Sequence, residues 1–286
     1  MVLIMKIIEF AKEMKIYSEK FRLQGKKIAF VPTMGYFHEG HLFLMREAKK
    51  MADFLAVSIY VNPTQFGPRE DLSKYPRDFE RDAKMAQDVG VDVIFYPSNE
   101  EMYPRGYQTY VDVEEVTKNL CGLSRPVHFR GVTTICAKLF HIVKPHIAVF
   151  GKKDYQQYIT IKRMVTDLNM DLEIVGLPTV READGLAMSS RNVYLKEERP
   201  SALALIASLK LAQKLYDQGE RESSKIISQV RKLISQAPYT DIDYVKICDT
   251  ETIKDVEKVG KGDFIALAVK VAKTRLIDNH VFGEKI

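Results

Sequence analysis

The stretch KIAFVPTMGYFHEGH, from Lys27 to His41, decides the fold. Its first five residues are apolar and partly β-branched after the lysine, which is typical of a buried strand. Apolar residues then recur at helical spacing between Leu42 and Ala48, so we expect a helix that begins near His38. A strand that leads through a glycine-containing turn into a helix is the start of a parallel βαβ unit.

The same alternation of strand and helix patterns continues over the first 180 or so residues. Apolar runs predict strands at Lys27–Val31, Leu55–Val61, Val91–Phe95, Ile147–Phe150 and Leu172–Val175. Helical stripes are formed by Phe10, Met14, Tyr17 and Phe21, and by Phe79, Ala83, Ala86 and Val89. Strands that are apolar throughout and separated by helices predict an α/β fold, in which helices cover both faces of a parallel sheet. Ligands of such sheets lie at the carboxyl ends of the strands.

The pattern changes after about Gly185. Arg199–Gln218 and Ser223–Gln236 have helical periods, and Asp243–Ile247 and Phe264–Val271 predict strands. The length of 286 residues corresponds to about two domains of roughly 150 residues. We therefore predict a first domain over residues 1–184 and a smaller α+β domain over residues 185–286.

Charge and composition narrow the class of protein. The sequence has 43 basic and 38 acidic residues, and the net charge of +5 is small for its length. A dedicated nucleic-acid-binding protein would concentrate its basic residues on one face, whereas a small excess leaves room for a local site for an anionic ligand. Hydrophobic residues make up 46% of the chain, which excludes wholesale disorder.

Cysteines and apolar runs predict a cytoplasmic location. Cys121, Cys136 and Cys248 are widely spaced, odd in number and without a C-x-x-C pair, as expected of reduced thiols in the cytoplasm. The apolar stretch Val132–Phe150 contains Lys138, Lys144 and Pro145 among its interruptions, so we do not expect it to span a membrane. We identify no targeting signal.

The turn before the predicted helix has the properties of a phosphate site. Gly35 and Gly40 allow a tight turn and a close approach of the backbone to a ligand. The amino end of a helix presents free N–H groups and a positive dipole end. His38 and His41 lie three residues apart, on one helical face, where they can donate to phosphate oxygens. Two alternatives stay open: the histidines only cap the helix at the surface, or they bind zinc, which would need a third ligand.

Three more polar segments follow predicted strands or the predicted domain boundary. They are Ser58–Gly67 with Gln65, Ala148–Gln157 with its Lys-Lys-Asp run, and Ala187–Asn192 with two hydroxyls and an arginine. An amide suits a hydroxyl beside a carboxylate, and basic groups suit phosphates. Each segment alone is explained as well by a solvated loop, a charged turn with a helix cap, or a polar linker. Their conjunction at the strand ends of one sheet and at the boundary favours a nucleotide site.

In this order and spacing, the motifs P-T-M-G-x-x-H-E-G-H, V-N-P-T-Q-F, H-F-R-G-V, F-G-x-K-D-Y-Q-Q and M-S-S-R-N resemble the pantothenate synthetase (pantoate–β-alanine ligase) family. The resemblance covers essentially the whole chain. The family belongs to the H-x-G-H nucleotidyltransferases, and M-S-S-R-N resembles a variant of the mobile K-M-S-K-S loop of class I aminoacyl-tRNA synthetases. The resemblance implies a Rossmann-like parallel sheet that binds nucleotide and pantoate, followed by a C-terminal α+β lid.

The resemblance implies an ATP-dependent ligation in two steps. The carboxylate of pantoate attacks the α-phosphate of ATP, which gives pantoyl adenylate and pyrophosphate. The amine of β-alanine then displaces AMP and gives pantothenate. The implied partners are ATP with Mg²⁺, pantoate and β-alanine in a homodimeric cytoplasmic enzyme, with no nucleic acid and no membrane.

The resemblance also implies roles for residues. His41, His38 and Lys153 match catalytic positions, with His41 the general acid. ATP contacts match Met34, Gly35, Tyr36, Phe37, His38, Glu39, Gly40, His41, Gly151, Lys152, Lys153, Asp154, Val180, Met188, Ser189, Ser190 and Arg191. Gln65 and Gln157 match the glutamines that hold pantoate, and Gln65 also lies where β-alanine arrives. We expect His38, His41, Lys153 and Arg191 to act on one triphosphate.

The chain departs from the family pattern in a few places. Tyr36-Phe37 replaces smaller residues, Lys152 replaces a common Glu, and Val127 replaces a usual Gly before His128 and Arg130, whose roles we leave open. Metal ligands are unknown: the acidic run Asp78, Glu80 and Asp82 could hold Mg²⁺, with Asp82 first, but we interpret it as a capped, solvated helix start.

Two other functions remain as alternatives. One is a nucleotidyltransferase that loads tRNA, against which the small net charge and the small C-terminal block speak. The other is a regulator that binds nucleotide without turnover, which would leave the set of catalytic groups unexplained.

Overall fold

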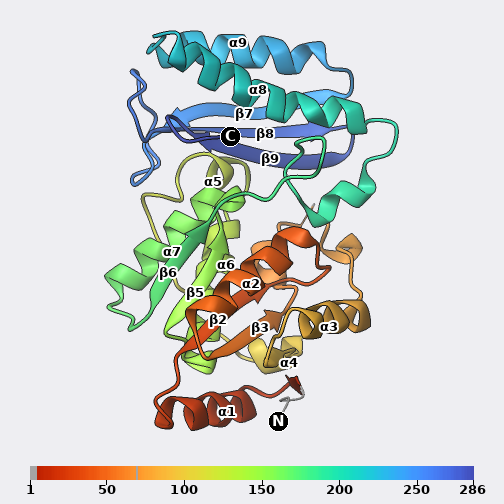
Figure 1. The fold of residues 1–286 in the computed structure, drawn as a ribbon, viewed down its shortest axis with the longest axis vertical. Coiled ribbons are helices and arrows are strands. Elements are labelled where there is room, and N and C mark those ends of the chain that lie inside the picture. Colours follow the sequence, from red (N-terminus) through yellow and green to blue (C-terminus); the bar gives the residue numbers. More distant parts are fainter. Residues whose placement is uncertain (1–4, 69) are drawn as a thin grey trace. The chain divides into compact units, whose positions relative to one another are not determined.

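In the computed structural model, which describes residues 5–68 and 70–286, six parallel strands form one sheet in the order β1-β4-β3-β2-β5-β6. Figure 1 labels β2, β3, β5 and β6 of this sheet. Their bounds are β1 Lys6–Ile8, β2 Ile28–Thr33, β3 Phe54–Ile59, β4 Val93–Phe95, β5 Ile147–Gly151 and β6 Glu173–Leu177. From β2 the chain builds outward to β3 and β4, and then returns to place β5 on the other side of β2. The strand order therefore reverses between β2 and β5, where α/β proteins bind their ligands.

Helices cover both faces of this sheet, as predicted. On one face lie α1 (Ala11–Leu23) and α6 (His128–Val143), which pack on β2 and on each other. On the other lies α2 (Glu39–Met51), which packs on β2, β3, β5 and α3 (Phe79–Asp88). The side chains of β2 alternate between the two layers: Phe30 meets Phe140 of α6 edge to face, whereas its neighbours Ala29 and Val31 pack in the cluster of Met45 from α2. Burial on both faces explains the continuous apolar run of this strand.

The C-terminal part forms a separate two-layer structure of one sheet and two helices. Strands β7 (Thr240–Cys248), β8 (Phe264–Val271) and β9 (Thr274–Val281) are antiparallel, and α8 (Arg199–Asp217) and α9 (Ser223–Gln236) pack against the sheet (Figure 1). Leu205 and Leu209 of α8 share one buried cluster with Val230 of α9 and Leu267 of β8. This is the smaller α+β block that the sequence predicts.

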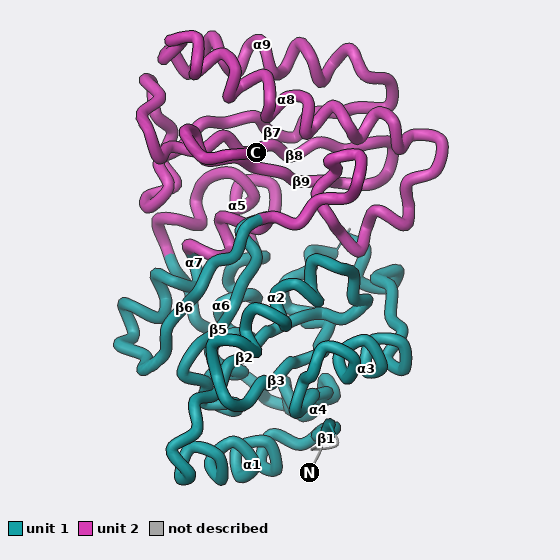
Figure 2. The backbone as a smooth tube through the Cα atoms, viewed as in Figure 1, with its two compact units in different colours: residues 1–113, 127–152, 160–178 teal, residues 114–126, 153–159, 179–286 magenta. Residues whose placement is uncertain are grey.

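The chain divides into two compact units (Figure 2). The first contains residues 1–113, 127–152 and 160–178, of which 1–4 and 69 are outside the described part. The second contains residues 179–286 together with two earlier segments, 114–126 and 153–159. The segment that carries Lys153 and Gln157 thus belongs to the second unit by its contacts. The predicted functional division at residue 184 remains a prediction.

Several elements lie outside the predicted set. They are the strands β1 and β9 and the helices α4 (Asn99–Met102), α5 (Cys121–Ser124) and α6, while α7 (Tyr155–Asp167) follows the polar segment as expected. The buried face of β9 carries Thr274, Asp278 and His280 beside Leu276, so the strand shows no apolar alternation. The stretch Val132–Phe150 contains most of α6 and most of β5.

No helix within residues 5–68 and 70–286 is long and apolar enough to cross a membrane.

Candidate functional site

The turn between β2 and α2 has a backbone that only a glycine can begin. Gly35 has φ +81°, and a Cβ atom on it would lie 3.0 Å from both Asp82 Oδ2 and Ile59 Cγ2. Tyr36 follows with φ 52°. Such angles are costly for residues with a Cβ, so the surroundings must hold the turn in place.

His38 and His41 lie side by side at the amino end of α2. His38 is the N-cap, as predicted for the helix start, and its Nδ1 accepts a hydrogen bond from the Gly40 N–H at 3.1 Å. His41 Nδ1 in turn accepts from the His38 N–H at 3.4 Å, and the two ring centroids are 4.1 Å apart. Helix capping is therefore part of what His38 does. Both histidines are half-buried, so part of the pair is exposed to solvent.

Asp82 of α3 holds the turn from below. Its Oδ2 accepts from the Tyr36 N–H at 2.5 Å and its Oδ1 from the Phe37 N–H at 2.7 Å. Arg81 donates to the Phe37 carbonyl at 2.8 Å and places its guanidinium 5.0 Å from the centre of the Tyr36 ring. Burial raises the pKa of Asp82, and the two backbone N–H groups oppose that rise. Two residues of α3 thereby fix the positive-φ turn.

The interpretation of Asp82 as part of a solvated helix start is wrong. The carboxylate is 1% exposed and both of its oxygens accept backbone hydrogen bonds, whereas Asp78 is the residue that caps α3. Across the described part of the chain, no three His, Cys, Asp or Glu side chains come together as metal ligands would. Zinc binding by the two histidines therefore has no third ligand within the described residues.

Gln65 lies beside Met34, at the end of the next strand. The 3₁₀ turn Pro63–Gln65 follows β3, and Gln65 is 7% exposed, with Nε2 3.0 Å from the Met34 sulfur. Its Oε1 accepts from Asn62 Nδ2 at 3.2 Å, and Asn62 also donates to the Gly131 carbonyl at 3.0 Å. The hydroxyl of Tyr103 donates to Asn62 Oδ1 at 2.9 Å. Because Oε1 faces Asn62, the orientation of the Gln65 amide is fixed with its NH₂ group toward Met34.

The start of α6 explains the H-F-R-G-V segment. A Cβ atom on Gly131 would lie 2.5 Å from the Thr64 carbonyl oxygen and 2.6 Å from the backbone N and Cα of Gln65. Helix α6 can therefore pack this closely on the turn only because residue 131 is a glycine. His128 Nδ1 is 3.0 Å from the Gln65 carbonyl oxygen. Arg130 lies over the Tyr110 ring, with its guanidinium carbon 4.1 Å from the centroid. The segment thus supports the Gln65 turn.

A cavity of about 590 Å³ opens at the carboxyl ends of β1, β4, β3 and β2. Met34, Gly35 and Tyr36 line it from the glycine turn, and Tyr60 and Tyr96 line it from the ends of the neighbouring strands. Burial raises the pKa of Tyr60, whose hydroxyl donates to Asn99 Oδ1 at 2.9 Å, so this phenol stays protonated. The first unit therefore carries a ligand-sized space lined by three of the predicted ATP residues, Met34, Gly35 and Tyr36.

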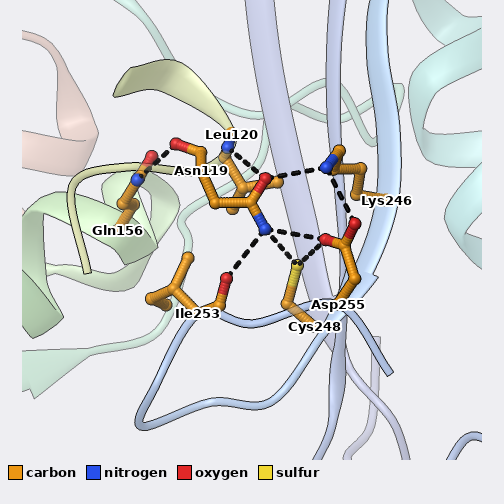
Figure 3. A network of polar contacts seen from close by, with 7 residues as sticks. All are labelled: Asn119, Leu120, Gln156, Lys246, Cys248, Ile253 and Asp255. Atoms are coloured by element: carbon orange, nitrogen blue, oxygen red, sulfur yellow. Dashed lines mark hydrogen bonds and ion pairs between the residues drawn. The ribbon is translucent and has the colours of Figure 1, made fainter. Parts of the chain in front are cut away.

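In the second unit, Gln156 holds the segment that also contains Lys153 and Gln157, and Figure 3 shows its contact with Asn119. Gln156 is buried, donates to the carbonyls of Val116 and Asn119 at 2.9 and 2.8 Å, and accepts from the Cys121 N–H at 3.0 Å. The Asn119 side chain continues the network: it accepts from Lys246 Nζ at 2.8 Å and donates to Asp255 Oδ1 at 2.7 Å. The start of α7 is thereby tied to the loop before α5 and to β7.

Val180 and the Met188–Arg191 segment lie together in the second unit. The Met188 N–H donates to the Val180 carbonyl at 3.0 Å, and Ser189 caps the 3₁₀ turn Ser190–Tyr194 by accepting from the Arg191 N–H at 3.2 Å. Asn192 donates to Glu182 Oε1 at 2.6 Å and to the Ala187 carbonyl at 3.1 Å. These bonds give the predicted closing loop a defined shape.

The predicted residues thus form two groups. Met34–His41, Gln65, Gly151 and Lys152 follow or end strands of the parallel sheet in the first unit, whereas Lys153, Asp154, Gln157, Val180 and Met188–Arg191 belong to the second. Sequence patterns did not reveal the supporting roles of Asp82, Asn62 and Gln156. The burial of Asp82 has a local signal, because it lies three residues after Phe79, next to the apolar stripe of its helix, whereas its partners in the turn have none.

Known proteins resemble this chain along nearly its whole length. The family model described as pantoate-beta-alanine ligase matches residues 6–281. A pantothenate synthetase from Syntrophus aciditrophicus is 67% identical over 283 residues, which are 99% of either chain. The solved pantoate-beta-alanine ligase (pantothenate synthetase) of Thermus thermophilus has a TM-score of 0.92 and 42% identity, covering 97% of this chain and 99% of that one. The pantoate-beta-alanine ligase of Francisella tularensis, complexed with beta-gamma ATP and beta-alanine, has a TM-score of 0.77 and 32% identity, covering 97% and 98%.

Proposed function

The chain belongs to the pantoate–β-alanine ligase family, and from this premise we propose how its own residues carry out the ATP-dependent joining of pantoate to β-alanine. The enzyme is a ligase that forms a C–N bond. Because a carboxylate is a poor electrophile, it is first converted to an acyl adenylate. An oxygen of the pantoate carboxylate attacks the α-phosphorus of ATP and pyrophosphate leaves. The β-alanine nitrogen then attacks the acyl carbon, loses a proton, and AMP leaves.

The glycine turn and its two histidines carry this proposal. They follow β2 at the position where the strand order reverses, and the first turn of α2 begins there. We assign the α-phosphate to the amino end of α2, where His41 donates a proton or hydrogen bond as charge moves to the leaving pyrophosphate. His38 holds both the helix start and His41, so it orients its neighbour as well as contacting phosphate.

Gln65 is assigned to pantoate. Asn62 donates to its Oε1, which directs the NH₂ group toward a carboxylate or hydroxyl beside Met34. Fixing both reactants can supply roughly 7–11 kcal/mol of the barrier, provided that the reacting atoms are aligned. The rigid support of Gln65 by Asn62 and Gly131 suits that task.

Residues of the second unit are assigned to ATP and pantoate by their match to the family. Lys153 would contact phosphate, the Val180 backbone would contact adenine, and Arg191 would contact phosphate from its 3₁₀ turn. Gln157 would contact pantoate. Arg191→Ala should therefore raise the KM for ATP more than the KM for pantoate, and steady-state kinetics with each substrate varied in turn will test this.

Mg²⁺ enters as part of the substrate MgATP. The described residues offer no group of three metal-ligating side chains, and Asp82 accepts hydrogen bonds from the turn. Mg²⁺ is a hard cation that keeps several of its waters and binds phosphate oxygens, so it needs few protein ligands. When bound, Mg²⁺ reduces the repulsion between the phosphates and an incoming carboxylate.

We also propose a cytoplasmic homodimer whose partners are small molecules, with no role for nucleic acid or membrane. The cytoplasmic location is supported by Cys121, Cys136 and Cys248, which are buried thiols without disulfides. The homodimer rests on the family resemblance.

Isotope transfer tests the reaction directly. Protein is mixed with MgATP, β-alanine and pantoate labelled with ¹⁸O in its carboxylate, and products are followed by mass. We expect pantothenate, pyrophosphate and AMP that carries one ¹⁸O, because the attacking oxygen stays on the α-phosphorus. Label in inorganic phosphate with ADP would mean attack at the γ-phosphorus and would refute the adenylate. ATP binding without turnover would instead identify a regulator.

A further inference from the structure

Two consecutive residues of β9, Asp278 and Asn279, each hold a segment to which ATP contacts are assigned. Strand β9 runs along β8 as an antiparallel neighbour, with Leu267 opposite Asp278 and Ala266 opposite Asn279. Both partner segments, around Lys153 and around Val180, belong to the same compact unit as the strand. The strand is far from both in sequence, so these contacts arise only in the folded unit.

Asp278 forms a two-pronged ion pair with Arg181. The distances are 2.7 Å from Arg181 Nη1 to Asp278 Oδ2 and 3.1 Å from Nη2 to Oδ1. The Asp278 side chain is 1% exposed and that of Arg181 19%, so both are largely withdrawn from water. Parallel N–H···O bonds of this kind fix direction as well as distance. Arg181 is consequently held in one orientation.

Arg181 connects this pair to the Val180–Met188 segment. Its backbone forms an antiparallel bridge with Ala187, and its Nη1 also donates to the Gly185 carbonyl at 3.2 Å. The hydrogen bond from the Met188 N–H to the Val180 carbonyl lies directly beside this bridge. Anchoring Arg181 therefore anchors the small hairpin that presents the Val180 backbone and the start of the closing loop.

Asn279 fixes the other segment. Its Nδ2 donates to the Lys153 carbonyl at 2.8 Å. Burial raises the pKa of Asp278, and the Arg181 guanidinium and the Lys153 ammonium are among the groups that oppose this rise. The Lys153 side chain is thus within electrostatic reach of the carboxylate next to Asn279.

We propose that Asp278 and Asn279 are positioning residues for ATP, which set the spacing between the backbone that receives adenine and the lysine that receives phosphate. Neither residue is assigned a contact with substrate. The proposal rests on the assigned ATP roles of Val180 and Lys153. It predicts selective losses in the use of ATP, because Gln65 of the first unit is untouched and the segment with Gln157 keeps the hydrogen bonds of Gln156.

Asn279→Ala tests the part of the proposal that concerns Lys153. Losing one hydrogen bond to the Lys153 backbone should raise the KM for ATP about two- to tenfold and leave the KM for pantoate unchanged. Ile277→Val is the matched control, since it shortens a side chain two positions earlier on the same face of β9 and should leave both constants unchanged. A merely structural role would lower kcat through a smaller active fraction, with both KM values unaltered, and that result would overturn the proposal for Asn279.

Arg181→Lys tests the part of the proposal that concerns adenine and the Val180 backbone. Lysine keeps the positive charge but cannot form the two-pronged ion pair with Asp278. The readout is the ratio of kcat/KM for ATP to that for ITP, which differs from ATP at the adenine amino group. We expect this ratio to fall about threefold or more, while kinetics with pantoate at saturating ATP stay near wild type. Asp278→Asn should act in the same direction if it folds. An unchanged ratio in Arg181→Lys would refute this part of the proposal whether or not Asp278→Asn folds.

Lys153→Ala separates this proposal from the assignment on which it rests. If Lys153→Ala leaves the KM for ATP and the rate of adenylate formation unchanged, the assigned role of Lys153 is wrong. If Lys153→Ala impairs adenylate formation but Asn279→Ala and Arg181→Lys do not alter the use of ATP, the positioning role alone is wrong.

Discussion

Gly131 lies so close to Gln65 that a Cβ atom on the glycine would come within 2.6 Å of the backbone N and Cα of the glutamine. The atoms that a Cβ would meet belong to the backbone of Thr64 and Gln65, so no flexible side chain can move away to make room. The Gly131 carbonyl also accepts from Asn62, which fixes the Gln65 amide. Helix α6 and the turn that carries Gln65 therefore set each other's position.

Gly131→Ala should displace the Gln65 turn. We expect the free energy of unfolding to fall by about 1–3 kcal/mol, as for other overpacked sites, and the KM for pantoate to rise. Gly260→Ala is the control, since a Cβ atom there meets no backbone atom and only the Asp263 carboxylate, at 3.3 Å. Urea unfolding and pantoate titrations measure both effects. Wild-type values for Gly131→Ala would contradict the close packing.

Asp82→Asn should loosen the glycine turn. The amide has a single acceptor oxygen, so one of the N–H groups of Tyr36 and Phe37 would face an NH₂ group and lose its partner. A buried donor without a partner costs about 1–3 kcal/mol, and the KM for ATP should rise with it. Asp78→Asn provides the comparison, because Asn caps helices as well as Asp does. Equal stability and equal ATP kinetics in the two variants would disprove the role of Asp82.

His41→Ala should fold normally and lose adenylate formation by about two orders of magnitude or more, as removal of a transition-state donor often does. Single-turnover formation of pyrophosphate from MgATP and pantoate measures this step apart from product release. His141→Ala removes an exposed histidine on α6 and should have wild-type rates. A near-wild-type single-turnover rate for His41→Ala would remove the residue from the chemistry.

His280 should make the enzyme sensitive to mild acid. Burial, aided by the nearby Arg181 guanidinium, lowers the pKa of His280 to about 4, and its Nε2 is 2.7 Å from Gln213 Oε1. In the unfolded chain histidine binds a proton near pH 6.5, so the unfolded state takes up more protons between pH 6.5 and 4 and stability falls as pH falls through that window.

The comparison of wild type with His280→Gln at about pH 7.5 and about pH 5, on either side of the ordinary histidine pKa, tests this effect. We expect the difference in urea midpoint to favour wild type less at the lower pH than at the higher one, because glutamine does not titrate. A difference that stays constant between the two pH values would show that His280 is not the group responsible.

The sequence predicts the parallel sheet well because its strands are buried on both faces, and Ile28–Val31 and Phe54–Val57 are apolar throughout. It does not predict β9, whose buried positions include Asp278 and His280 and whose stability depends on Arg181 and Gln213. Such polar pairs become visible only when distant segments are brought together. Strand β1 escapes for a different reason, since its three residues are too few to show a period.

The histidine pair and the glycine turn could be predicted from local spacing, because helix geometry places residues three apart on one face. The supports of the site could not. Asp82 acts on a turn more than forty residues earlier, and Gln156 acts through Asn119, so neither has a local pattern that marks its partner. The family resemblance predicts a role for Gln157, whereas its neighbour Gln156 makes the buried hydrogen bonds.

Because Arg81 and Asp82 of α3 hold the glycine turn, this motif cannot be moved into another protein without them. A designer who grafted Val31–His41 onto another parallel sheet would carry over the glycines and histidines and leave behind the carboxylate that satisfies the Tyr36 and Phe37 N–H groups. The positive φ of Tyr36 would then have nothing to maintain it, and the turn would relax. The smallest portable unit is therefore the turn together with Arg81 and Asp82 on a helix that faces it.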